Sequence, residues 1–134
     1  MKHILVGFDG STNAQRALEA ALDVAKADTR ITVVAAAQAA APPGLVLPVG
    51  AEGLEERKRE LEDAQHHLAA VGRDAEVVAV TGAPADVLVE EAKKRGVDLI
   101  VVGRRGLDGA ERLVMGSVSS KVTRTAACSV LVAR

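Results

Sequence analysis

The sequence predicts an α/β fold, a single three-layer sandwich in which helices cover both faces of a five-stranded parallel sheet. The main observation is that short apolar runs of strand length alternate with longer segments of helical periodicity along the chain. The composition agrees, because the hydrophobic fraction is 49% although the chain has one Phe and no Tyr or Trp. Side chains this small suit helices that lie close to a sheet. With 134 residues, we expect one domain over residues 1–134.

Five short runs have the character of buried strands. The first, Ile4–Phe8, is continuously apolar and stops at Asp9-Gly10, as expected of a parallel strand covered on both faces. The other predicted strands are residues 31–37, 75–80, 99–102 and 129–133. Right-handed crossovers between successive strands would give a doubly wound sheet.

The first two helical segments are marked by their apolar positions. One follows the N-cap residues Ser11-Thr12-Asn13 and runs to Ala25, and Thr12 with Gln15 has the spacing of a capping box. The other is expected over residues 51–71, where three leucines at intervals of seven residues form one apolar stripe: Leu54, Leu61 and Leu68. Such a stripe is typical of a helix that covers a sheet.

The last two helical segments are marked by their ends. Pro84 suits the first turn of the third helix, Lys93-Lys94-Arg95 lies in its last turn, and Gly96 ends it. The fourth helix is expected over about residues 117–126, after a glycine-rich segment.

Charge and composition exclude several partners. Lys and Arg number 17 against 18 Asp and Glu, so no basic excess is available for a nucleic acid backbone. Aromatic side chains for stacking on bases are also missing. No apolar run is long enough to cross a membrane, and the run after His3 is too short for the core of a signal peptide. A single cysteine, Cys128, fits a reducing compartment, so we expect a cytoplasmic protein without nucleic acid or membrane partners.

Two strand ends carry residues suited to ligand binding. In open parallel sheets, ligands bind at the carboxyl ends of strands, where the strand order reverses. The first strand ends in Gly7-Phe8-Asp9 and the fourth in Gly103-Arg104, so both would face one crevice if they flank the reversal. There Asp9 could accept hydrogen bonds from a ribose or help to hold a metal ion.

The segment after the fourth strand is rich in glycine. Four glycines lie within residues 103–116: Gly103, Gly106, Gly109 and Gly116. Glycines let backbone N–H groups approach a ligand, and Gly116-Ser117 at a helix start favours an anion such as phosphate. From the glycine count alone, a surface loop with an N-cap serine is an equally good interpretation. The chain has neither a GxxxxGK[ST] motif nor a GxGxxG motif after the first strand, so neither a P-loop nor a dinucleotide site is predicted.

The spacing of these glycines resembles a known signature. Gly103, two residues, Gly106, nine residues and Gly116-Ser117 match the G-2x-G-9x-G-[S/T] nucleotide motif of the universal stress protein family. Further similarity is carried by residues 4–11, 82–88, 98–103 and 128–132. The resemblance implies the adenine-nucleotide alpha-hydrolase-like fold, with strand order 3-2-1-4-5.

The resemblance also implies a ligand and its contacts. ATP-binding members hold ribose and phosphates at positions that correspond here to Gly103, Arg104, Gly106, Gly116 and Ser117, with Gly109 in the same loop. Asp9 and Gly7 would lie beside the adenosine, and Ala36 at the end of the second strand would contact adenine. The implied cofactor is ATP or another adenine nucleotide, alone or with Mg²⁺ or Mn²⁺. Two positions depart from the family pattern: Ser129 stands where proline is common, and Ala35 where histidine is frequent.

Other polar residues have simpler interpretations. Arg105 is expected in solvent, His66 and His67 on a helix surface, and His3 at the exposed end of a strand. Cys128 is expected to be a buried thiol. Ser11 is expected to cap a helix, because no histidine is placed to activate it.

Three functions remain open from the sequence. The favoured one is an ATP-binding stress-response or regulatory protein. The others are a slow ATP hydrolase and an interaction module with an empty pocket. No general base stands beside the phosphate loop, which favours binding over hydrolysis, and the intact glycine motif favours binding over an empty pocket. The short apolar strand over residues 129–133, if it forms a sheet edge, is expected to pair with a second copy in a homodimer, as the family commonly does.

Overall fold

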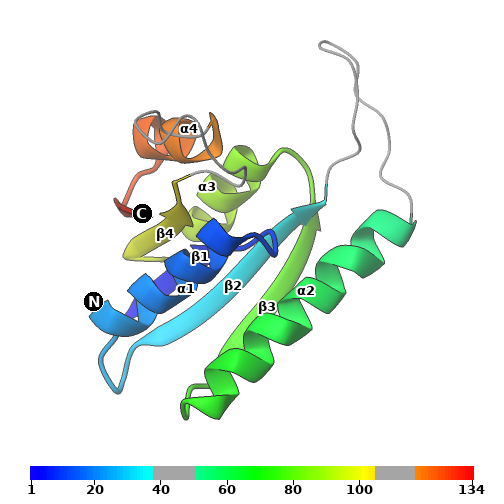
Figure 1. The fold of residues 1–134 in the computed structure, drawn as a ribbon. Coiled ribbons are helices and arrows are strands. Elements are labelled where there is room, and N and C mark those ends of the chain that lie inside the picture. Colours follow the sequence, from blue (N-terminus) through cyan, green and yellow to red (C-terminus); the bar gives the residue numbers. More distant parts are fainter. Residues whose placement is uncertain (38–50, 105–116) are drawn as a thin grey trace.

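The computed structural model describes residues 1–37, 51–104 and 117–134, and their arrangement confirms the predicted fold (Figure 1). A five-stranded parallel sheet has the strand order β3-β2-β1-β4-β5. The strands are β1 His3–Gly7, β2 Arg30–Ala37, β3 Ala75–Thr81, β4 Leu99–Gly103 and β5 Ser129–Ala133. The helices are α1 Thr12–Val24, α2 Ala51–Ala70, α3 Pro84–Arg95 and α4 Ser117–Thr125. The chain leaves β1 toward β2 and β3, and returns beside β1 as β4, so the strand order reverses between β1 and β4.

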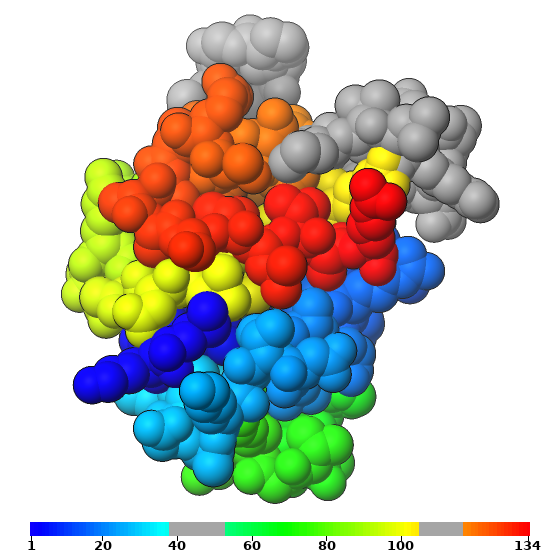
Figure 2. Space-filling view, turned by 90° about the vertical axis from the view of Figure 1, so that its left-hand side faces the viewer, coloured from blue at the N-terminus to red at the C-terminus, as the bar shows by residue number. Residues whose placement is uncertain are grey.

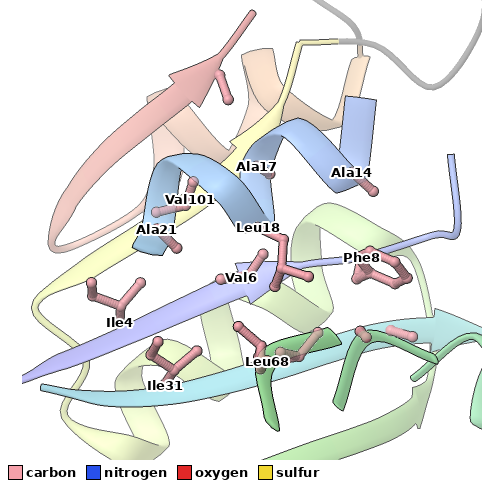
Figure 3. Packing of buried hydrophobic residues seen from close by; sticks show 14 of the residues in the cluster. Ile4, Val6, Phe8, Ala14, Ala17, Leu18, Ala21, Ile31, Leu68 and Val101 are labelled. Atoms are coloured by element: carbon pink, nitrogen blue, oxygen red, sulfur yellow. The ribbon is translucent and has the colours of Figure 1, made fainter. Parts of the chain in front are cut away.

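Two apolar clusters hold the three layers together. Alternate residues of β1 point to opposite faces of the sheet, so Ile4 and Val6 join one cluster and Leu5 joins the other. The first cluster packs α1 and α2 on the sheet through residues such as Leu18 and Leu68 (Figure 3). The second cluster packs α3 and α4 on the opposite face, with Leu88, Ile100 and Val122 among its members.

Two glycines explain how closely the helices approach the sheet. A Cβ atom on Gly103 would lie 2.5 Å from the carbonyl oxygen of Asn13, at the start of α1. A Cβ atom on Gly7 would lie 2.8 Å from Cδ1 of Leu88, on α3. A side chain at Gly103 would therefore displace the backbone at the start of α1, whereas at Gly7 the flexible end of Leu88 would have to move.

The start of α1 differs from the sequence prediction. The N-cap is Ser11, whose Oγ accepts a hydrogen bond from the Ala14 N–H at 3.1 Å. Thr12 is already inside the helix, so the predicted capping box of Thr12 and Gln15 is wrong. The capping role predicted for Ser11 is confirmed.

The position of His3 also differs from the sequence prediction. His3 was expected at an exposed strand end, but it is only 5% exposed. Its Nε2 atom is hydrogen-bonded to Thr32 Oγ1 at 2.7 Å, and the Asp98 carboxylate accepts its backbone N–H at 2.9 Å. Burial, together with the nearby Arg30 guanidinium, lowers the pKa of His3 below its ordinary value. The imidazole is enclosed by contacts with Thr32 of β2 and with the neighbourhood of Arg95 at the end of α3, which the local sequence does not reveal.

Three further polar residues, His66, His67 and Cys128, can be compared with their predicted positions. His66 and His67 are exposed, as expected, and His67 Nε2 lies 2.5 Å from Glu19 Oε1 on α1. Cys128 is half-buried rather than fully buried, and burial raises the pKa of its thiol. None of the helices in the described ranges is long and apolar enough to span a bilayer.

Candidate functional site

A pocket of about 610 Å³ opens at the carboxyl ends of β1, β2 and β4. It lies at the point where the strand order reverses, which is where open parallel sheets bind ligands. The starts of α1, α3 and α4 border it. Its lining residues are Gly7, Phe8, Asp9, Ser11, Asn13, Ala14, Val34, Ala36, Pro84, Leu88, Val102, Gly103, Arg104, Ser117, Val118, Ser119 and Ser120.

The predicted site residues that the structure describes all line this one pocket. They are Gly7, Asp9, Ala36, Gly103, Arg104 and Ser117. Gly106, Gly109 and Gly116, as well as Arg105, lie outside the described residues. The sheet therefore brings together residues that are more than 100 positions apart in the sequence, although their roles toward a ligand remain predictions.

One end of the pocket is apolar. Val34 and Ala36 of β2 and Leu88 of α3 contribute side chains without polar atoms. Leu88 approaches closely because Gly7 has no Cβ. These small aliphatic walls can accept a flat heterocycle, but they offer it no aromatic partner.

The turn after β1 places a carboxylate at the pocket. Asp9 is exposed, and its Oδ1 accepts the Ser11 N–H at 3.0 Å. Gly10 follows with φ +80°, a left-handed conformation that glycine adopts without strain. The turn lets the chain reverse into α1 while Asp9 stays at the rim of the pocket.

The opposite end of the pocket is polar and lies between the end of β4 and the start of α4. Ser117 and Ser120 come from the first turn of α4, where the N–H groups of a helix start and the helix dipole favour an anion. The backbone of Arg104 is held from two sides. Its N–H donates to the Ala133 carbonyl at 2.9 Å, and its carbonyl accepts from Ser119 Oγ at 3.0 Å.

Charge in the described lining comes from Asp9 and Arg104. No group of three or more His, Cys, Asp or Glu side chains in the described ranges could hold a metal ion. Asp9 thus offers a single carboxylate, and a Mg²⁺ ion beside it would take further oxygens from a phosphate ligand and water. The described residues fit a cation carried by a phosphate ligand better than a metal site built by the protein alone.

Several residues of α1, of α3 and of the first α4 turn after Ser117 line the pocket but were not predicted from the sequence. Asn13, Pro84, Leu88, Val118, Ser119 and Ser120 also line the pocket. Three hydroxyls in four residues at a helix start, after a glycine-rich segment, were a usable signal for the α4 part. The α3 part had no local signal, because Leu88 reaches the pocket through the packing of α3 on β1.

Comparison with known proteins decides the family. The model of the universal stress protein family matches residues 1–134. The chain belongs to the universal stress protein family. Universal stress protein YxiE of Bacillus subtilis is 34% identical to this chain over an alignment of 144 residues, gaps included. The alignment covers 98% of this chain and 97% of that protein.

Solved universal stress proteins share the fold. A universal stress protein in complex with cAMP is 30% identical with a TM-score of 0.77, covering 99% of this chain and 97% of that one. The universal stress protein of Archaeoglobus fulgidus in complex with dAMP is 25% identical with a TM-score of 0.77, covering 100% and 98%. The ligands in both structures are adenine nucleotides.

Proposed function

We propose that residues 1–134 form a single domain that binds an adenine nucleotide, with ATP as the first ligand to test. The observation that carries this proposal is the meeting of Gly7 and Asp9 with Gly103, Arg104 and Ser117 around one pocket where the strand order reverses. We further propose that the protein acts in the cytoplasm as a stress-response or regulatory protein, with the nucleotide as a conformational ligand.

The pocket has two ends that suit the two ends of a nucleotide. Its volume of about 610 Å³ lies within the range of small-ligand sites. Adenine would rest on the aliphatic walls of Val34, Ala36 and Leu88, and the ribose hydroxyls would donate to the Asp9 carboxylate. The phosphates would then reach Arg104 and the start of α4, where positive charge and the helix dipole favour an anion.

The relatives support this class of ligand. Universal stress proteins with 30% and 25% identity to this chain have been solved with cAMP and dAMP. The G-2x-G-9x-G-[S/T] spacing of Gly103, Gly106, Gly116 and Ser117 is intact. A bound Mg²⁺ or Mn²⁺ ion would be held through the phosphates and Asp9, where it would neutralise phosphate charge.

Hydrolysis is the second candidate function. Within the described lining, Asp9 is the sole carboxylate and no histidine is present. Because Asp9 lies at the end of the pocket suited to the ribose, it is poorly placed to activate water beside a terminal phosphate. We therefore propose a binding protein, and a turnover assay with ATP separates the two functions: phosphate release that falls in Asp9→Asn would favour the hydrolase.

The site is tested by comparing two carboxylate variants. Asp9→Asn keeps an oxygen for the Ser11 N–H but removes the charge that accepts ribose hydroxyls, so ATP affinity should fall about fivefold to tenfold. Asp23→Asn, an exposed position on α1 outside the pocket, is the matched control and should bind as the wild type does. Calorimetry measures both, and equal affinity in Asp9→Asn and Asp23→Asn would contradict the placement of the ribose.

We also propose a homodimer through β5. Among the described strands it pairs with β4 alone, at the edge of the sheet, where it reaches the molecular surface (Figure 2). Its outer backbone groups are available for pairing with a second copy. Light scattering at micromolar concentration should report a dimer, and a monomer at that concentration would contradict this part of the proposal.

A further inference from the structure

Ser119 is a buried polar residue at the polar end of the pocket. It is 1% exposed and lies in the first turn of α4. Its Oγ donates a hydrogen bond to the carbonyl of Arg104, 15 positions earlier in the sequence, at 3.0 Å. The hydroxyl therefore joins the exit of β4 directly to the start of α4.

This bond spans the two segments that form the polar end of the pocket. Arg104 follows β4, Ser117 begins α4, and residues 105–116 separate them in sequence. Helix α4 packs mainly against α3 and β5, and the Ser119 hydroxyl adds a direct link from its first turn to the end of β4. The N–H of Arg104 is held by Ala133 of β5, and Ser119 holds the other side of the same residue.

We propose that Ser119 is a positioning residue for the phosphate end of the site. It acts through the Arg104 backbone by fixing the distance between Arg104 and the N–H groups at the start of α4. A phosphate group would contact both segments at once, whereas adenine would rest on β2 and α3. This inference rests on the proposed nucleotide function and assigns a further residue to it.

The test uses ligands that differ only in phosphate. Ser119→Ala removes the hydroxyl and leaves the Arg104 carbonyl without this donor. Calorimetry should then give an ATP dissociation constant about threefold to tenfold higher than in the wild type. The dissociation constant for adenosine should change less, because adenosine has no phosphate to contact both joined segments at once. Ser119→Thr, which keeps a hydroxyl on the same Cβ, should recover part of the ATP affinity.

A second hydroxyl of α4 supplies the matched control. Thr125 Oγ1 donates to the Lys121 carbonyl at 2.7 Å, but Thr125 is exposed at the far end of the helix. Thr125→Ala should bind both ligands as the wild type does. In the absence of any ligand, hydrogen exchange at the Arg104 amide should be faster in Ser119→Ala than in Thr125→Ala.

The outcomes separate the inference from the proposed function. A wild type that binds neither ATP nor adenosine contradicts the proposed function and the inference with it. If the wild type binds but Ser119→Ala loses affinity for ATP and adenosine equally, Ser119 is merely structural and the inference is wrong. Unchanged ATP affinity, or unchanged exchange at Arg104, overturns it as well.

Discussion

The two ends of the same parallel sheet are built differently. At the carboxyl end, glycines and small or hydroxyl-bearing side chains surround a pocket whose described lining has Asp9 and Arg104 as its charged residues. At the amino end, polar side chains are joined to one another: His3 to Thr32, Arg95 to Glu76 and Glu91, and Asp98 to two backbone N–H groups. The carboxyl end therefore contains a pocket, whereas hydrogen bonds and ion pairs link the polar side chains of the amino end.

The difference teaches where substitutions should affect stability and where they should affect binding. The helix starts at the carboxyl end leave N–H groups that a ligand can use. At the amino end, the polar side chains named above already have partners within the protein. We therefore expect amino-end changes to lower the free energy of unfolding without altering nucleotide affinity, and the reverse for most carboxyl-end changes.

The largest effect on stability should come from Gly103, a position at the carboxyl end where a substitution disturbs the fold as well as the pocket. Gly103→Ala places a Cβ about 2.5 Å from the Asn13 carbonyl oxygen, so the start of α1 must move. We expect the free energy of unfolding to fall by about 3 kcal/mol, measured by urea denaturation. Gly72→Ala is the control, since a Cβ there meets open space at φ +79°, and it should cost about 1 kcal/mol. Equal losses in the two variants would show that the contact with α1 is unimportant.

A smaller effect is expected from the ion pairs of the amino end. Arg95→Met removes the guanidinium that bonds Glu76 at 2.8 Å and Glu91 at 3.0 Å, and Glu91 is only 7% exposed. We expect a loss of about 2 kcal/mol in unfolding free energy, with ATP affinity unchanged. Lys94→Met, from the same helix turn but 75% exposed, should cost about 0.5 kcal/mol at most. A fall in ATP affinity in Arg95→Met would contradict the separation of the two ends.

The pH dependence of stability sharpens the description of the amino end. Burial and Arg30 lower the pKa of His3 below 6.5. A hydrogen bond to the Arg95 backbone and the Glu76 carboxylate oppose this lowering, and the Arg95 charge adds to it. Just below pH 6.5 the unfolded chain therefore binds more protons than the folded one. The His3 contribution to the free energy of unfolding is complete above pH 6.5 and is lost as the pH falls from 6.5 through the lower pKa of the folded state. Thermal unfolding between pH 7.5 and about 5.5 should show a shallower decline in His3→Gln than in the wild type. His66→Gln, an exposed control, should keep the wild-type decline.

Glu60 acts in the opposite direction. Burial raises the pKa of Glu60 above its ordinary value of 4.5. The contribution of Glu60 to the free energy of unfolding therefore falls as the pH rises above 4.5. The comparison of His3→Gln with His66→Gln cancels this contribution, since Glu60 is present in both proteins. Identical pH profiles for these two variants would contradict the buried, neutral state of His3.

The smallest effect is expected at a surface ion pair beside the pocket. Lys121 Nζ of α4 lies 2.9 Å from Asp86 Oδ1 of α3, and both side chains are about half exposed. A double-mutant cycle of Lys121→Ala and Asp86→Ala should give a coupling energy of about 0.5 kcal/mol. A coupling energy above about 2 kcal/mol would mean that this ion pair between α3 and α4 contributes to stability as strongly as the ion pairs of the amino end.

The fold was predictable because its signals are local and repeated. The apolar run at Ile4–Phe8, Pro84 at the start of α3 and Gly96 at its end each indicate an element boundary without help from distant residues. The wrong capping box shows the limit of such signals, since Ser11 and Thr12 are adjacent and both suitable. In the structure Ser11 is the cap: its Oγ accepts the Ala14 N–H, and the Asp9 carboxylate accepts the N–H of Ser11.

The site was predictable only in part. Gly7, Asp9, Gly103 and Arg104 stand at strand ends, so the topology of a parallel sheet brings them together. Leu88 and Ser119 reach the pocket through the packing of α3 and α4, which depends on contacts between distant segments. His3 was misjudged for the same reason, because its burial comes from β2 and from the neighbourhood of Arg95 rather than from residues beside it.

The central claim is that the carboxyl end binds an adenine nucleotide, and titration of the wild-type protein with ATP tests it most directly. Calorimetry, with the thermal unfolding midpoint recorded alongside, should show saturable binding at one site per chain and a higher midpoint with ATP. Arg95→Met should bind equally well from its lower starting stability. Neither heat nor a shift in the midpoint at millimolar ATP would contradict the account.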